Sequence, residues 1–374
     1  MNSYIPHLII GFATLVSFLI TFSSIPTILT VSHTKHLFAA PNNRNVHKIQ
    51  IPTLGGLGIF IGFIFTYALF TEWFKIPALP FLIPSLLVIF SIGIKDDILI
   101  TAPVIKLMGQ LFSTLIIVGL GKLIITDFHG FFGLVPNHLT GFLITIFLIL
   151  ALINGFNLID GIDGLAGIIA IITITAFSIW FYINGNLEIP IIGAIIVGAL
   201  VAFLYFNLFA EKQKIFMGDT GSLILGFIIA VVAVKFMEFN SLKNNPHLAF
   251  SMTSAPAVAL GILIVPVVDT IRVFFIRVSK GKSPFVADKN HIHHRILTLG
   301  FSHIHATLLI AGANLFFIAL SFLLRDFGTL RLGILNISLG LLFAYLPALF
   351  IDIKKRRMKN KNTPSNSSGE QTAW

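Results

Sequence analysis

The acidic residues of this chain are gathered in short polar segments that separate long apolar stretches. Seven of the fifteen Asp and Glu residues lie in five such segments, which contain Asp96 with Asp97, Asp160 with Asp163, Asp219, Asp269 and Asp288. A carboxylate close to hydrocarbon is costly and usually serves a function. Carboxylate oxygens suit Mg²⁺ or Mn²⁺, so the pattern indicates a metal site for a phosphorylated substrate.

The most specific segment is NGFNLIDGIDG at residues 154–164. Its Asn154, Asn157, Asp160 and Asp163 can bind a metal or accept hydrogen bonds. An ordinary polar turn would not need so many oxygen ligands this close to hydrocarbon. We therefore interpret the segment as part of the metal and substrate site.

The segment FMGDTGS at 216–222 opens an apolar stretch, so it places Asp219 beside a helix N-terminus, which attracts phosphate. Phe216 could stack on a base. The alternative interpretation is that Asp219 only caps the helix that follows it.

Basic residues accompany the acidic ones. Lys48 precedes PTLGG at 52–56, and Lys106 follows the Asp96-Asp97 pair by ten residues. A lysine carries a mobile positive charge that is suited to phosphate. For the Lys48–PTLGG segment, the alternative is an interfacial lysine beside glycines that allow close helix packing. For the Asp96-Asp97 segment, the alternative is an ordinary hydrated helix end.

A histidine-rich segment near residue 290 also carries charge. Its candidate residues are His291, His293, His294 and Arg295. The His-x-His-His spacing does not match the usual zinc spacings, so we favour contact with phosphate over zinc binding.

The composition requires a membrane around these segments. The 374 residues are 56% hydrophobic and 11% charged, whereas soluble domains contain about 25% charged residues. The chain has no Cys, which excludes disulfides, thiolate metal sites and cysteine nucleophiles. Much of the net charge of +10 lies in short loops and the tail, so it indicates orientation in anionic lipid and not a nucleic-acid partner.

Stretches of about 20 apolar residues predict an all-α, polytopic membrane bundle of eleven spans. The predicted spans are 5–30, 54–72, 79–94, 104–122, 139–156, 164–183, 189–209, 221–238, 254–275, 306–324 and 330–351. Two of them, 79–94 and 139–156, are short, so ten spans is the alternative.

The distribution of Lys and Arg orients the bundle. With the N-terminus outside and the C-terminus inside, 19 of the 25 basic residues fall on the cytoplasmic side, as the positive-inside rule favours. All five acidic segments then meet at that face, as catalytic cytoplasmic loops. Residues 1–353 are predicted to form one catalytic domain and 354–374 a basic, disordered tail.

Taken together and in this order, the segments resemble the polyprenyl-phosphate N-acetylhexosamine-1-phosphate transferase superfamily. The match covers PTLGG, Asp96-Asp97, 154–164, 216–222 and the histidine segment. The HIHH form resembles the bacterial UDP-GlcNAc:undecaprenyl-phosphate transferases of O-antigen, enterobacterial common antigen and teichoic acid synthesis. The phospho-N-acetylmuramoyl-pentapeptide transferase branch ranks second because its histidine loop differs.

The resemblance implies a role for each matching residue. Asp219 would bind Mg²⁺ with help from Asn157, and Asp160, Asp163 and Phe216 would hold uridine. The remaining implied site residues are Asn154 for the UDP-sugar and, around the phosphates and sugar, Asp96, Asp97, Lys48, Lys106, His291, His293, His294 and Arg295. We hypothesise that the paired aspartates position groups and do not remove a proton.

The implied activity is transfer of GlcNAc 1-phosphate from a UDP-sugar to undecaprenyl phosphate in the bacterial inner membrane, with release of UMP. A homodimer is one assembly that the sequence allows. A lipid or sugar transporter, or flippase, is the alternative from another class. Its charged residues should lie at mid-span, whereas here they lie at span ends.

Overall fold

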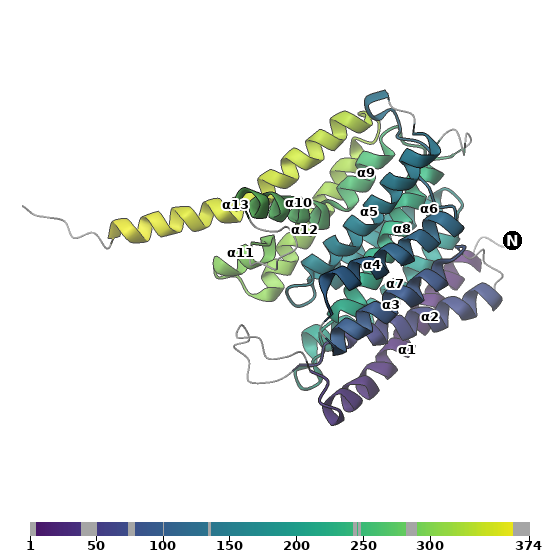
Figure 1. Cartoon of the computed structure of the whole chain (residues 1–374), viewed down its shortest axis with the longest axis horizontal. Helices are drawn as coiled ribbons and strands as arrows, with labels where there is room; N and C mark the ends of the chain where they lie inside the picture. The colour runs from purple at the N-terminus through teal and green to yellow at the C-terminus, as the bar shows by residue number, and fades with distance from the viewer. Residues whose placement is uncertain are drawn as a thin grey trace, which may run out of the picture.

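The computed structural model describes residues 5–38, 51–73, 79–99, 101–133, 136–241, 245, 248–281 and 290–361. These residues form helices and connecting segments, with no strand among them (Figure 1). The helices are α1 (Ile5–Thr34), α2 (Gly55–Trp73), α3 (Leu82–Ile98), α4 (Pro103–Leu115), α5 (His138–Ile159), α6 (Leu165–Ile183), α7 (Glu188–Leu204), α8 (Gly218–Phe239), α9 (Ala255–Ile262), α10 (Ile264–Ser279), α11 (Ile292–Thr298), α12 (His303–Leu323) and α13 (Thr329–Lys361). The predicted all-α membrane bundle is confirmed.

Short 3-10 and π-helical turns complete the secondary structure. They are η1 (Ile116–Leu120), which continues α4, η2 (Phe131–Gly133), η3 (Tyr205–Phe209), which continues α7, and η4 (Glu211–Gln213). Turns of the π type inside longer helices are frequent at functional sites.

Eight helices of the described ranges are long and apolar enough to cross a membrane, and the pair α9 and α10 makes a ninth if it counts as one span. The shorter α2 is apolar over Gly55–Thr71. Each predicted span coincides with a helix or with this pair, while the total of eleven and the orientation stay predictions.

The predicted span at 254–275 is not one continuous helix. It breaks at Leu263, where α9 and α10 meet at 80°. Pro266 lies in the first turn of α10 and has no N–H to donate to the carbonyl of Ile262. The break therefore falls where the series of helical backbone hydrogen bonds is already interrupted.

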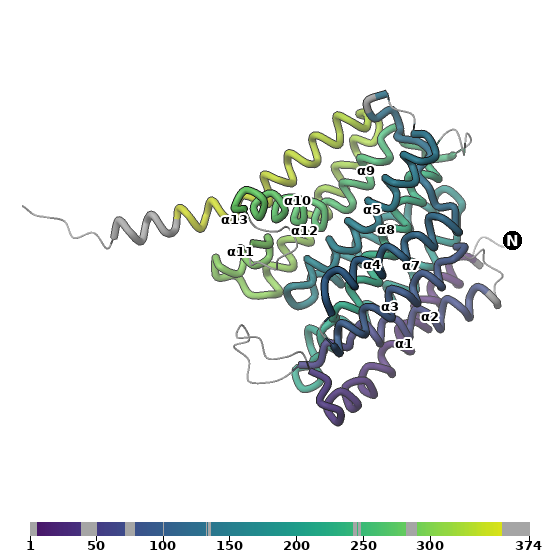
Figure 2. Tube along the Cα trace, viewed as in Figure 1, coloured from purple at the N-terminus to yellow at the C-terminus, as the bar shows by residue number. Residues whose placement is uncertain are grey.

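The C-terminal helix is also longer than the sequence pattern suggests. Helix α13 continues past the expected boundary at residue 353 to Lys361. The part of α13 that is coloured yellow in Figures 1 and 2 extends beyond the neighbouring helices.

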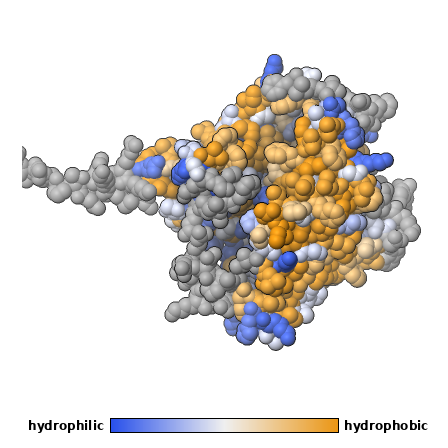
Figure 3. Space-filling model, in the orientation of Figure 1, coloured by the Kyte–Doolittle hydropathy of each residue, from blue (hydrophilic) through white to orange (hydrophobic). Residues whose placement is uncertain are grey.

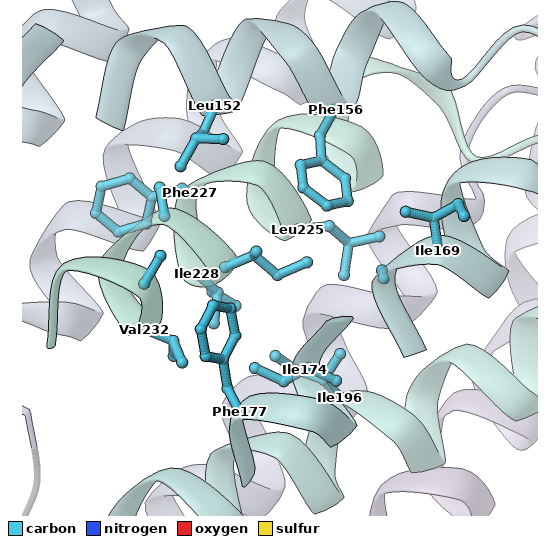
Figure 4. Close-up of a cluster of buried hydrophobic side chains, with 14 of the residues drawn as sticks. Leu152, Phe156, Ile169, Ile174, Phe177, Ile196, Leu225, Phe227, Ile228 and Val232 are labelled. Carbon is cyan, nitrogen blue, oxygen red and sulfur yellow. The ribbon is translucent and has the colours of Figure 1, made fainter. Parts of the chain in front are cut away.

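Helices α7 and α8 lie at the centre of the bundle, because 83% of the residues in the most apolar stretch of each are buried. Side chains of α5, α6, α7 and α8 form the core between them, with Phe156, Phe177, Leu225 and Ile228 among the residues in contact (Figure 4).

The outside of the bundle is apolar as well. Figure 3 shows a broad hydrophobic surface with hydrophilic residues gathered toward its edges. Phe147 of α5, for example, is 72% exposed. Such a surface is expected to face lipid, because in water several hundred Å² of apolar area would be exposed to solvent at a high free-energy cost.

Candidate active site

The N-terminus of α8 is the centre of the candidate site. Asp97, at the end of α3, accepts hydrogen bonds from the backbone N–H groups of Asp219 (2.7 Å) and Thr220 (3.0 Å), and from the Thr220 hydroxyl (2.5 Å). These N–H groups have no partner within the helix. Asp97 therefore caps α8 from another helix, and Asp219 does not serve as the cap.

The Asp219 carboxylate does not cap α8, and it lies among polar groups of the three helices α3, α4 and α5. Asn157 of α5 donates its amide to Asp219 Oδ1 (2.9 Å) and to the Ser222 hydroxyl (2.9 Å). Lys106 of α4 pairs with Asp219 Oδ2, and its ammonium is 3.4 Å from Oδ2 of Asp96. The structure thus brings together residues that are more than 100 positions apart.

Asp96 differs from its neighbour Asp97 in its partners. Its Oδ1 accepts from the Thr101 backbone N–H (2.9 Å) and from the Thr101 hydroxyl. Thr101 lies in the short connection between α3 and α4, so Asp96 fixes that connection while its other oxygen faces Lys106.

The PTLGG motif holds the segment before α8 in place. The backbone N–H of Phe216 donates to the Pro52 carbonyl (2.9 Å), and those of Gly55 and Gly56 donate to the carbonyls of Phe216 (2.9 Å) and Met217 (2.8 Å). Lys48, which precedes this motif, lies outside the described residues.

A glycine is required where the two segments meet. Gly218 has φ +71°, and a Cβ there would collide with the Thr53 carbonyl and stand 2.6 Å from an Asp97 oxygen. The sequence FMGDTGS therefore needs its first glycine for close approach, as well as for a left-handed backbone.

The loop between α5 and α6 carries Asp160 and Asp163. Burial raises the pKa of Asp160 to about 7, and the nearby charges of Asp219, Asp97 and Asp163 add to this shift. Burial alone would also raise the pKa of Asp163, but hydrogen bonds from His303 and Lys214 outweigh it and lower that pKa. One carboxyl is thus poised to titrate near neutrality while the other stays ionised.

Asp163 and Phe216 both lie near Lys214 at one edge of the site. Lys214 Nζ is 2.7 Å from Asp163 Oδ2 and 5.6 Å from the centre of the Phe216 ring. His303, at the start of α12, is 3.3 Å from the same carboxylate oxygen. The half-buried aromatic face and the adjacent carboxylate form a surface on which a base and a ribose could lie.

Asn154 is placed differently from the other polar residues of its segment. Its amide donates to Gln110 Oε1 of α4 and to the Leu150 carbonyl, both at 2.8 Å. Gln110 is one helical turn from Lys106 on α4, so this contact joins α5 to α4 next to the lysine.

The histidine segment forms α11, which packs against α12 and α13, and its start is hydrogen-bonded to α10. His291 is buried, and its Nδ1 lies 2.8 Å from Asp269 Oδ2, while the Ile292 N–H donates to Asp269 Oδ1 (2.9 Å). The carbonyl of Asn290 accepts from Arg272 (2.7 Å). Asp269 therefore fixes the start of α11 as well as the ring of His291.

The next two histidines occupy different surroundings. His293 is buried, and its Nε2 packs so closely on Gly161 that a Cβ at that position would overlap the ring. Burial, with the nearby charge of His294, lowers the pKa of His293 to about 3, so this imidazole is neutral at pH 7. His294 and Arg295 are half-buried and remain the more accessible members of the segment.

Mg²⁺ fits the residues around Asp219. The carboxylates of Asp219 and Asp96 are hard oxygen ligands, and the Lys106 ammonium lies against both, where a cation fits. Asn157 donates its amide N–H to Asp219 and so orients that carboxylate. Among the described residues, no three His, Cys, Asp or Glu side chains are grouped in a way that could hold a metal ion. Mg²⁺ commonly keeps several waters and substrate phosphates as ligands, so it needs only one or two protein carboxylates.

The sequence is similar to those of known proteins. Residues 79–237 match the family model described as glycosyl transferase family 4. A Haemophilus influenzae protein named undecaprenyl-phosphate alpha-N-acetylglucosaminyl 1-phosphate transferase is 32% identical over 303 residues, covering 79% of this chain and 81% of that protein. This chain belongs to glycosyl transferase family 4. An Escherichia coli K12 protein of the same name is 29% identical over 277 residues, covering 73% of this chain and 72% of its own length.

Membership of glycosyl transferase family 4 confirms the resemblance that the motifs indicated. The matched family region contains the Asp96-Asp97 pair, Lys106 and the segments around Asp160 and Asp219, and it ends before the histidine segment.

Several residues of this family member's site were not predicted from the sequence. They are Thr101, Gln110, Asn207, Lys214, Thr220 and His303, together with the role of Asp269. A polar residue inside an apolar run, such as Gln110 or Asn207, is the signal that could have found some of them, because an unneeded polar group in a span is costly.

Proposed function

We propose that this protein transfers a sugar 1-phosphate, GlcNAc 1-phosphate as the first candidate, from a UDP-sugar to undecaprenyl phosphate. The observation that carries the proposal is the meeting of Asp96, Asp219, Asn157 and Lys106 at the N-terminus of one central helix, in a protein whose relatives bear that name. The product would be a lipid diphosphate sugar, the first membrane intermediate of a cell-envelope polysaccharide.

Electrostatics is the main obstacle to this reaction, because both substrates are anions. An oxygen of the lipid phosphate attacks the β-phosphorus of the UDP-sugar, the bond from that phosphorus to the bridging oxygen breaks, and UMP leaves with the electron pair. Bound Mg²⁺ would neutralise the charge that develops on the phosphates. Lys106, 16% exposed at the side chain, supplies a positive charge from the protein itself.

The chain's own acids support a reaction without a strong base. A phosphate monoester has a second pKa of about 6, so the attacking group is largely dianionic at neutral pH. Both oxygens of Asp97 are engaged at the N-terminus of α8, and Asp96 is held by Thr101. These contacts favour positioning roles for the two residues.

The surroundings of Lys106 suit a lipid substrate. On the same helix, Val104 is 67% and Met108 65% exposed. Helix α4 therefore has an apolar outer face next to its single lysine, along which a prenyl chain could lie while its phosphate reaches Lys106.

The uridine would bind at Phe216, Asp160 and Asp163, with the ring stacked on Phe216. The relatives described above are GlcNAc 1-phosphate transferases by name, so we do not propose the muramoyl-pentapeptide alternative. We place the protein in the bacterial cytoplasmic membrane with this site facing the cytoplasm.

The test is UMP release by the purified protein in detergent. With Mg²⁺, undecaprenyl phosphate and UDP-GlcNAc together, UMP should form in step with a lipid-linked product. Omitting the lipid, adding EDTA, or substituting Asp219→Asn should each abolish it. Equal UMP release without lipid, or undiminished turnover in EDTA, would contradict the proposal, and a panel of UDP-sugars would identify the donor.

A further inference from the structure

Asn207 is a buried polar residue at the end of a span, away from the metal-binding carboxylates. It lies in the π-helical turn η3, where α7 ends, and is 4% exposed. Its neighbours in the sequence are apolar or aromatic. Such a residue is costly near hydrocarbon unless its amide is fully used.

The amide of Asn207 connects two loops that are otherwise separate in the chain. Its Oδ1 accepts from the backbone N–H of Gly164 (2.8 Å), and its Nδ2 donates to the carbonyl of Ile215 (2.9 Å). Because one partner is a donor and the other an acceptor, the orientation of the amide is fixed.

Each of these backbone partners adjoins a residue of the candidate uridine site. Gly164 follows Asp163 directly and begins α6 with φ +75°, and the fully buried Ile215 directly precedes Phe216. On its other side, Phe216 is tied to Pro52 by a backbone hydrogen bond of 2.9 Å.

An ion pair joins the same two loops at the surface. Lys214 Nζ is 2.7 Å from Asp163 Oδ2, with the two side chains 29% and 19% exposed. This ion pair is partly exposed, so solvent screens it to some extent, whereas both hydrogen bonds of the Asn207 amide are buried. The buried amide is therefore the stronger of the two connections.

We propose that Asn207 is a positioning residue for the nucleotide half of the donor, because its amide sets the separation between the Asp160–Asp163 loop and Phe216. This inference rests on the proposed function. A uridine held between a ring and a carboxylate needs both at a fixed distance, and an error of about 1 Å can be costly to binding and rate.

The amide is the side chain that satisfies both loops. Asn207→Asp keeps the acceptor for Gly164 but turns an oxygen toward the Ile215 carbonyl, so the contact becomes repulsive. Asn207→Leu removes both hydrogen bonds and leaves a buried N–H and a buried carbonyl without partners.

The experiment measures KM separately for the two substrates in purified variants. For Asn207→Leu and Asn207→Asp we expect KM for UDP-GlcNAc to rise about tenfold, which corresponds to about 1.4 kcal/mol. Inhibition by UMP should weaken by a similar factor. KM for undecaprenyl phosphate should stay within about twofold, because Lys106 lies on α4 and Asp219 is held by Asp97 and Asn157 and not by Asn207.

Asn336→Leu is the matched control. Asn336 is also a fully buried asparagine that joins two segments, through the Ala257 carbonyl and the Ser321 hydroxyl (each 3.0 Å), but it lies on α13. It should lower the melting temperature to a comparable degree without changing the KM for UDP-GlcNAc.

The inference is overturned if the Asn207 variants turn over with unchanged KM for UDP-GlcNAc, if their KM values for both substrates rise together, or if Asn336→Leu raises the KM for UDP-GlcNAc by the same factor. Should Asn207→Leu not fold, UMP protection of the wild-type protein and of Asn207→Asp against thermal unfolding gives the same comparison. An inactive wild-type protein would instead contradict the proposed function itself.

Discussion

At the scale of single residues, the neighbouring acids Asp96 and Asp97 have different partners. Asp97 binds the N-terminus of α8 with both oxygens, whereas Asp96 contacts Thr101 and faces Lys106. Two carboxylates that are adjacent in sequence thus point to different elements. Sequence alone identifies the pair, but not which member supports the fold.

Replacement by alanine should separate the two roles. Asp97→Ala leaves the N–H groups of Asp219 and Thr220 without their cap, and loss of a cap costs about 0.5–2 kcal/mol. We expect this variant to lose both activity and several degrees of melting temperature, measured by differential scanning fluorimetry. Asp96→Ala should lose activity with a much smaller change in melting temperature. Equal destabilisation by the two substitutions would contradict the assignment.

The raised pKa of Asp160 predicts a pH dependence of stability. A carboxyl whose pKa in the folded protein is about 7, above its ordinary value, stabilises the fold fully only below that ordinary value, and the contribution is lost as the pH rises through 7. Asp160→Asn cannot titrate and so does not lose stability in this way. The melting temperature of the variant, relative to that of the wild type, should therefore rise between pH 5 and pH 8. A difference that is constant across this range would show that Asp160 does not titrate there.

At the scale of elements, the position of α8 depends on glycines that allow close helix approach. A Cβ on Gly56 of α2 would stand 2.6 Å from the Gly221 Cα of α8. Backbone atoms cannot yield as the end of a flexible side chain can. The contact at Gly221 lies two residues from Asp219, so the spacing of α2 and α8 also places the candidate metal ligand.

Gly56→Ala should consequently destabilise the protein by about 1–3 kcal/mol, the usual cost of overpacking, and reduce turnover. Gly312→Ala is its control, since a Cβ on that glycine of α12 meets nothing within 4 Å. The control should be neutral or slightly stabilising, because alanine is the better helix former. Equal melting temperatures for the two variants would rule out the close contact.

Span positions were predictable because an apolar run of sufficient length is a local property of the sequence. The break at Leu263 was missed, since a proline such as Pro266 is compatible with either a kinked or a divided helix in a membrane. The capping of α8 by Asp97 and the bridge made by Asn207 join segments that are distant in sequence. Contacts of this kind depend on tertiary packing and leave no periodic signal.

At the scale of the whole molecule, the acidic segments must share one face of the membrane to form a single site. Asp97, Asp163 and Asp219 lie at the same end of the bundle, close to one another. Lys122 and Glu238 lie at the opposite ends of α4 and α8 from Lys106 and Asp219. The distribution of basic residues predicts that the acidic end faces the cytoplasm.

Because the chain contains no Cys, single cysteines can test this orientation. Lys212→Cys and Lys122→Cys introduce thiols at exposed positions near opposite ends of the bundle. A membrane-impermeant maleimide should label residue 122 in intact cells and residue 212 only in inverted vesicles. The reverse pattern would overturn the N-out, C-in topology.

The most direct test of the central claim follows the β-phosphorus of the donor. UDP-GlcNAc labelled at that atom is incubated with the purified protein, Mg²⁺ and undecaprenyl phosphate. Sugar 1-phosphate transfer predicts that the label enters the lipid fraction while unlabelled UMP is released in equal amount. Label that stays in the aqueous phase as UDP, with or without a glycosylated lipid, would contradict the account.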